Sequence, residues 1–96
     1  MEKQKNSVEE ISAVCNSVKK VLIKKNIRYG NSALSPIKVF SKFDNNLDSI
    51  LVRLDDKLSR IKNADVLRKN DVFDLVGYLL LYCVGRKWDN FEDLID

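Results

Sequence analysis

Histidine is absent from this chain of 96 residues, and only two cysteines, three glycines and one proline occur in it. The absence of histidine removes the most common general base and the usual ligand of zinc sites. The cysteines, Cys15 and Cys83, lie within apolar helical patterns. We interpret both as reduced packing residues of a cytoplasmic protein. Gly30 and Gly85 interrupt helical patterns, and neither belongs to a phosphate-binding glycine loop.

Long hydrophobic runs and alternating patterns are also missing. No apolar run approaches the ~20 residues that a membrane span needs, and the polar start MEKQKNSVEE is unlike a signal peptide. No segment alternates apolar and polar residues as a half-buried strand does. We therefore expect an all-α protein of the cytoplasm that has no membrane partner.

Apolar residues recur at intervals of three and four, which places them on one face of a helix. This spacing predicts helices over about 8–26, 36–43, 47–62 and 71–84, and a last helical turn at 89–92. Ser7 and Glu10 form a capping-box pattern. Asn70 is placed to cap the helix at 71–84, and Gly85 is placed to end it. The prediction is one helical domain of four to five helices over 7–96, after a polar segment at 1–6.

The segment 71–84 is apolar nearly all round. Such a helix is typically buried on most sides, so we expect 71–84 to be the most buried part of the chain. A monomer of this size has a modest core and cannot easily cover so much apolar surface. We therefore expect a helical homo-oligomer.

Polar residues interrupt the apolar pattern of two predicted helices, and on each helix they lie on one face. Asp71, Asp74, Tyr78 and Tyr82 follow one another at helical spacing, and Arg53, Lys57 and Arg60 lie on the helix at 47–62. Buried carboxylates need partners. In one interpretation, one of the three cations pairs with Asp71 or Asp74 and locks the two helices together. In the other, the polar seam binds a cation, an anionic ligand or both.

Positive charge is concentrated in the segment 19–28, which contains no acidic residue. Its members are Lys19, Lys20, Lys24, Lys25 and Arg28, and the turn residues Tyr29, Gly30, Asn31 and Ser32 follow. Lysine charge beside a turn with free amides is a reasonable phosphate site, although a solvated helix face is the simpler alternative. Nucleic acid is a less suitable ligand, because acidic residues near 71–74 and 89–96 interrupt a continuous basic surface.

Four aspartates on two helices form a candidate metal set. Asp55 and Asp56 lie on one predicted helix, and Asp71 and Asp74 lie on the next. Mg²⁺ prefers oxygen ligands, and a Mg²⁺ between helices that bridges to phosphate oxygens needs a set of this kind.

The motifs KNxxYGNS at 25–32, RxDDKxxR at 53–60 and DxxDLxGY at 71–78 resemble those of small phage-associated proteins distantly similar to MazG-like all-α nucleoside triphosphate pyrophosphohydrolases. The resemblance covers roughly 10–85. It implies a Glu-Glu-x-x-Glu block at Asp55, Asp56 and Ser59, and a Glu-x-x-Asp block at Asp71 and Asp74, which together hold Mg²⁺ on a nucleotide's phosphates. Three of the Glu positions hold Asp here, and Ser59 is a poor ligand for Mg²⁺.

These departures favour nucleotide binding without turnover. The chain is also similar in size and helical character to small phage proteins that sequester nucleotide immune signals, so an anti-defence sponge in the host cytoplasm is one expectation. The alternative is a Mg²⁺-dependent pyrophosphohydrolase. For the binder no catalytic residue and no cofactor is expected, and the ligand is a nucleotide or cyclic nucleotide. Its candidate ligand-binding residues are Lys24, Lys25, Arg28, Tyr29, Gly30, Asn31, Ser32, Arg53, Lys57, Arg60 and Tyr78. The metal residues, for an enzyme only, are Asp55, Asp56, Asp71 and Asp74.

Overall fold

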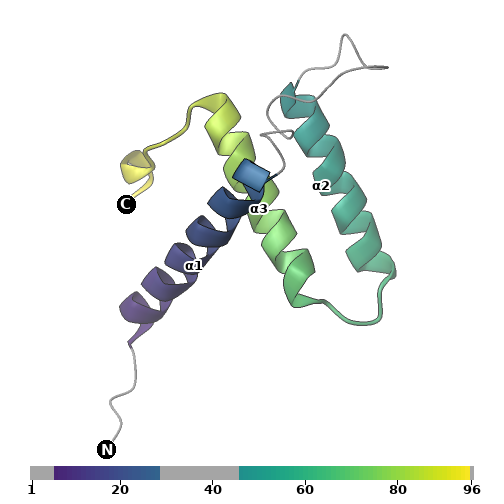
Figure 1. Ribbon diagram of the computed structural model, residues 1–96, viewed down its shortest axis with the longest axis horizontal. Coiled ribbons are helices and arrows are strands. Elements are labelled where there is room, and N and C mark those ends of the chain that lie inside the picture. The colour runs from purple at the N-terminus through teal and green to yellow at the C-terminus, as the bar shows by residue number, and fades with distance from the viewer. Residues whose placement is uncertain (1–5, 29–45, 96) are drawn as a thin grey trace, which may run out of the picture. The chain divides into compact units, whose positions relative to one another are not determined.

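The computed structural model describes residues 6–28 and 46–95 of the chain. These residues form three α-helices and one 3₁₀-helix, shown in Figure 1: α1 (Ser7–Arg28), α2 (Asn46–Asn63), α3 (Lys69–Arg86) and η1 (Glu92–Leu94). The described part holds no strand, so the all-α prediction is confirmed over it. The α-helices there number three rather than four to five, and the helix expected at 36–43 lies outside the described residues.

The chain divides into two units, Met1–Gly30 and Asn31–Asp96. The first contains α1, and the second contains α2, α3 and η1. The single helical domain that the sequence suggests for 7–96 stays a prediction.

The start of α1 is capped by Asn6 rather than by Ser7. The Glu9 amide donates a hydrogen bond of 2.9 Å to the Asn6 side-chain oxygen, and the Glu10 amide donates one of 3.0 Å to the Asn6 carbonyl. Ser7 is therefore the first helical residue, and the predicted Ser7–Glu10 capping box is wrong by one position. Asn and Ser are comparably good N-caps, which is why the pattern alone did not separate them.

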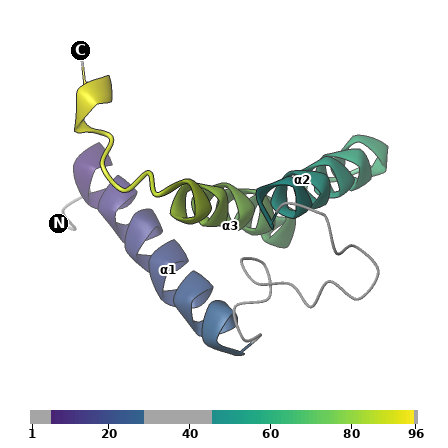
Figure 2. The same cartoon turned by 90° about the horizontal axis from the view of Figure 1, so that it is seen from above.

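Helices α2 and α3 lie side by side as a hairpin joined by residues 64–68 (Figures 1 and 2). Its core is small: Ile50 is fully buried and Leu54 is 8% exposed. Both lie, four residues apart, within the helix that apolar spacing predicts at 47–62, and Gly77 is the buried residue of α3.

Among the described residues, 71–84 does have the largest share of buried or half-buried residues, as expected, but the large buried side chains lie on α2 and not on α3. The outer apolar residues of α3 remain exposed: Val72, Val76, Leu79, Leu80 and Val84. One neighbouring helix, α2, covers only one side of α3, whereas a helix that is apolar all round needs neighbours on several sides. The apolar sequence of a helix indicates that it needs to be covered, but it does not show how many neighbouring helices the chain provides to cover it.

The end of α3 is closed by Lys87, and Gly85 lies inside the helix. Lys87 has a left-handed backbone, with φ 62°. The Trp88 amide donates to the Cys83 carbonyl at 2.9 Å, and the Lys87 amide donates to Val84 at 3.1 Å. These two bonds are those of a Schellman motif, in which glycine usually holds the left-handed position.

Trp88 is fixed beside this helix end by two ring contacts. Its ring meets Tyr82 edge to face, with centroids 5.9 Å apart, and the Arg86 guanidinium lies 4.7 Å from its centroid. The last helical turn expected at 89–92 is present slightly later, as η1. Within the described ranges, none of the helices combines the length and the apolar character needed to cross a bilayer.

Candidate functional site

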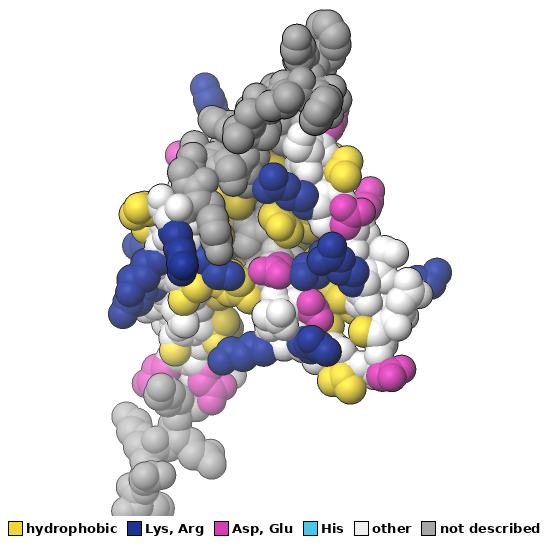
Figure 3. Space-filling view, turned by 45° about the vertical axis from the view of Figure 1, so that its right-hand side comes forward, with side chains coloured by type: hydrophobic (Ala, Val, Ile, Leu, Met, Phe, Trp, Pro, Cys, Tyr) yellow, Lys and Arg dark blue, Asp and Glu magenta, His cyan; other side chains and the backbone are white. Residues whose placement is uncertain are grey.

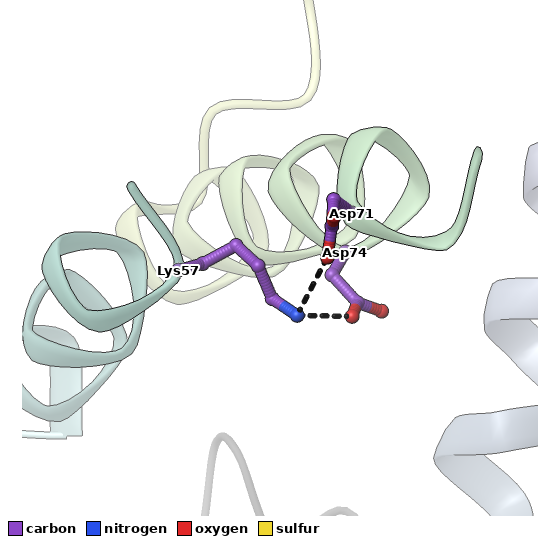
Figure 4. A network of polar contacts seen from close by, with 3 residues as sticks. All are labelled: Lys57, Asp71 and Asp74. Carbon is purple, nitrogen blue, oxygen red and sulfur yellow. Dashed lines mark hydrogen bonds and ion pairs between the residues drawn. The ribbon is translucent and has the colours of Figure 1, made fainter. Parts of the chain in front are cut away.

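The polar seam between α2 and α3 is organised around Lys57. Its Nζ lies 3.0 Å from Asp74 Oδ2 and 3.4 Å from Asp71 Oδ1. Figure 4 shows the lysine reaching from α2 between the two carboxylates of α3. The predicted pairing of a cation on α2 with Asp71 or Asp74 is therefore confirmed, and the lysine contacts both. We call these three residues the Lys57 cluster.

Helical spacing brings the two carboxylates together. Asp71 and Asp74 are three residues apart and so lie on one face, and Asp71 stands in the first turn of α3. A carboxylate in a first helical turn is stabilised by the free amides and by the helix dipole. The side chains are shielded, with exposed fractions of 12% for Lys57, 15% for Asp71 and 29% for Asp74.

The electrostatics of the cluster favour a charged lysine. The hydrogen bond to Asp74 is the largest of the influences that raise the pKa of Lys57 above its usual 10.5, and the bond to Asp71 adds to it, while burial opposes both. One positive charge faces two negative charges, so the cluster carries a net negative charge. A phosphate that approached Lys57 would meet two carboxylates, and Lys57 therefore suits a structural role better than the ligand-binding role that we expected.

The predicted metal set is not gathered at one point. Asp71 and Asp74 are engaged with Lys57, whereas Asp55 and Asp56 are exposed on α2. Among residues 6–28 and 46–95, no group of three or more acidic or cysteine side chains is placed to hold a metal ion.

The other candidates on the hairpin are dispersed. Arg53 is half-buried and lines a surface cavity of about 310 Å³ together with Asp48, Ser49 and Val52. Arg60 is exposed and Tyr78 is half-buried. The three further cavity residues were not predicted as a site. Asp48 and Ser49 stand four residues before Val52 and Arg53, and this helical spacing places the four residues on one side of α2.

The basic residues of α1 form the most concentrated positive charge among the described residues. All five are exposed: Lys19, Lys20, Lys24, Lys25 and Arg28. Lys20, Lys24 and Arg28 follow one another at intervals of four, so they form one row along the helix. Successive members are ~6 Å apart along the axis. We call these three residues the basic row. The predicted turn residues Tyr29, Gly30, Asn31 and Ser32 lie outside the described part of the chain.

Comparison with protein-family models, with curated proteins and with solved structures finds no match for this chain. Inference about function therefore rests on the residues themselves.

Proposed function

We propose that the protein binds a nucleotide, or a messenger derived from nucleotides, through its phosphates and holds it without turnover. The observation that carries this proposal is the basic row on α1. Three exposed cations on one helix face, with no acid between positions 19 and 28, supply charge along ~12 Å of the helix. That length suits a ligand that carries several phosphate groups in succession.

The Lys57 cluster supports binding over hydrolysis. A MazG-like hydrolase would need Asp71 and Asp74 as ligands of Mg²⁺. Here Lys57 neutralises part of their charge and occupies the space between them. A divalent cation would have to displace a partly shielded ammonium group from two carboxylates. The cluster therefore contributes to the hairpin's stability, and the phosphates are bound by the basic residues of α1.

Sequestration follows from binding without turnover. A protein that holds a nucleotide messenger intact lowers its free concentration in proportion to the protein's own amount. If the chain is encoded by a phage, this activity would withdraw an immune signal from the host, as the resemblance to sponge-like phage proteins suggests.

The experiment is incubation of the purified protein with a panel of linear and cyclic nucleotides, with and without Mg²⁺. The bound ligand is then recovered by denaturation and identified. We expect intact ligand in both conditions. Recovery of a nucleoside monophosphate together with pyrophosphate, only when Mg²⁺ is present, would replace the proposal with the hydrolase. Failure of every nucleotide to bind would reject both.

A matched pair of variants tests the basic row. Lys24→Ala removes the central cation of the row, whereas Lys62→Ala removes an exposed cation from the last turn of α2. A lost charged contact typically weakens binding about tenfold. We expect that loss for Lys24→Ala and an unchanged Kd for Lys62→Ala. Equal effects of the two substitutions would show a general charge effect and remove the assignment.

A further inference from the structure

The strongest feature left unexplained by phosphate binding is the apolar side of α1. This helix has 22 residues and none of them is buried. Val8 is 72% exposed and Ile11 is 63% exposed, and Val18 and Leu22 on the same side are half-buried. Figure 3 shows that apolar side chains reach the surface among the charged ones on the face that it displays.

A helix of this composition gains little stability from its own backbone. In proteins most of the stability of a helix comes from tertiary packing of its apolar face rather than from backbone propensity. The β-branched residues valine and isoleucine, which are frequent in α1, lower helix propensity further. The helix therefore needs a packing partner along its apolar side.

The apolar side has the pattern of a two-helix seam. Its residues alternate at intervals of three and four, which is the heptad spacing of the a and d positions of a coiled coil. They are Val8, Ile11, Cys15, Val18 and Leu22. We call these five residues the α1 stripe. The next position in the series is Lys25.

The charges at the two ends of α1 make it complementary to a second copy of itself in one direction. The first turn of α1 is acidic, with Glu9 and Glu10, and its last turn is basic, with Lys25 and Arg28. In a parallel pair of two copies, Lys25 would meet Lys25 of the partner in the seam, and like charges in contact are destabilising. In an antiparallel pair, the basic end of one copy lies beside the acidic end of the other.

We propose that the α1 stripe pairs with the α1 stripe of a second copy of this chain in antiparallel orientation. One register sets the a positions of each helix against the d positions of the other. In it, Ile11 faces Leu22 of the second copy and Cys15 faces Val18. The proposal is independent of phosphate binding. Lys20 and Lys24 of the basic row lie on the other side of the helix, so pairing leaves them accessible.

The test uses the direction-dependent formation of a disulfide. In a Cys15→Ala and Cys83→Ala background, Ile11→Cys and Leu22→Cys are made as two separate proteins. Each is oxidised mildly, alone and after mixing. Antiparallel pairing predicts a cross-linked dimer in the mixture and little in either protein alone, because the two Ile11 positions of a pair lie ~16 Å apart along the axis. Dimers of Ile11→Cys alone would overturn the orientation.

A second measurement does not depend on introduced cysteines. Sedimentation equilibrium of the parent should show a monomer–dimer equilibrium at micromolar concentrations. Lys25→Glu places like charges at both ends of the seam and should raise the dimer Kd about tenfold or more. Glu10→Lys in the same chain should restore it, and Lys62→Glu, on α2, should leave it unchanged. A parent that stays monomeric, or a double variant that is not rescued, would overturn the pairing. Nucleotide recovery is measured on the parent protein, so either result leaves the test of phosphate binding separate.

Discussion

The Lys57 ammonium group lies 3.0 Å from the Asp74 carboxylate, which places a cation of α2 in direct contact with an anion of α3. Asp71 completes the contact at 3.4 Å. The contact connects the two helices of the hairpin, whose apolar core consists of few buried side chains. Its loss should therefore be measurable as a change in stability.

Asp74→Asn should lower the thermal midpoint of unfolding by a few degrees, because it removes the closer of the two charge partners of Lys57. The loss should be the same with and without Mg²⁺, and the parent should be indifferent to the ion. Asp55→Asn, at an exposed position of α2, is the control and should change little. Stabilisation of the parent but not the variant by Mg²⁺ would instead demonstrate a metal site.

The raised pKa of Lys57 predicts a stability change at alkaline pH. A group that binds its proton more tightly in the folded state contributes its full stabilisation below the unfolded pKa, here near 10.5. That contribution is lost as pH rises through the higher folded pKa. Urea unfolding from about pH 9 to about pH 12 should show this loss in the parent and not in Lys57→Met. Parallel curves for the two proteins would contradict the assignment.

Leu54→Ala should destabilise the hairpin by ~2–5 kcal/mol, because it removes one of the two buried apolar side chains and leaves a cavity. Leu58→Ala is chemically the same substitution one turn later, where the side chain is 52% exposed, and it should cost much less. Chemical denaturation of both variants measures the difference. Equal losses would mean that Leu58 is covered in solution, for example by a second copy.

Lys87→Gly should raise stability by ~0.5–1 kcal/mol. The left-handed backbone of Lys87 is unfavourable for a residue that carries a Cβ atom, and glycine adopts it freely, at some cost in unfolded-state entropy. Lys62→Gly, within the last turn of α2, is the opposite control and should lower stability. Destabilisation by Lys87→Gly would show that the lysine side chain itself contributes to the helix end.

Helical periodicity predicted the three long helices to within one or two residues at each end. Periodicity is a local property, and each long segment contains several repeats of it. The end of α3 was harder to predict, because Gly85 and Lys87 lie two residues apart and only the hydrogen bonds of Trp88 and Lys87 show which one adopts the left-handed conformation.

The sequence predicted that a basic residue of α2 pairs with Asp71 or Asp74, but it did not show which basic residue. Arg53, Lys57 and Arg60 are spaced so that each can approach α3 from α2. The choice among them depends on how far the helices slide past one another, which is a property of the hairpin as a whole and of the connection at 64–68. Burial likewise depends on neighbours: Ile50 is covered and Leu79 is not, although both are large aliphatic residues of apolar segments.

The position of the Lys57 cluster along the chain has a consequence for the order of folding. Lys57 and Asp71 are separated by only 14 positions, across the short connection between the helices. Closing so short a loop takes ~100 ns or somewhat longer, far less than contacts between distant parts of a chain require. We therefore expect folding of the hairpin to nucleate at the connection. Pairing of α2 and α3 then extends from there toward Ile50. Φ-values should be high near Lys57 and lower toward the start of α2.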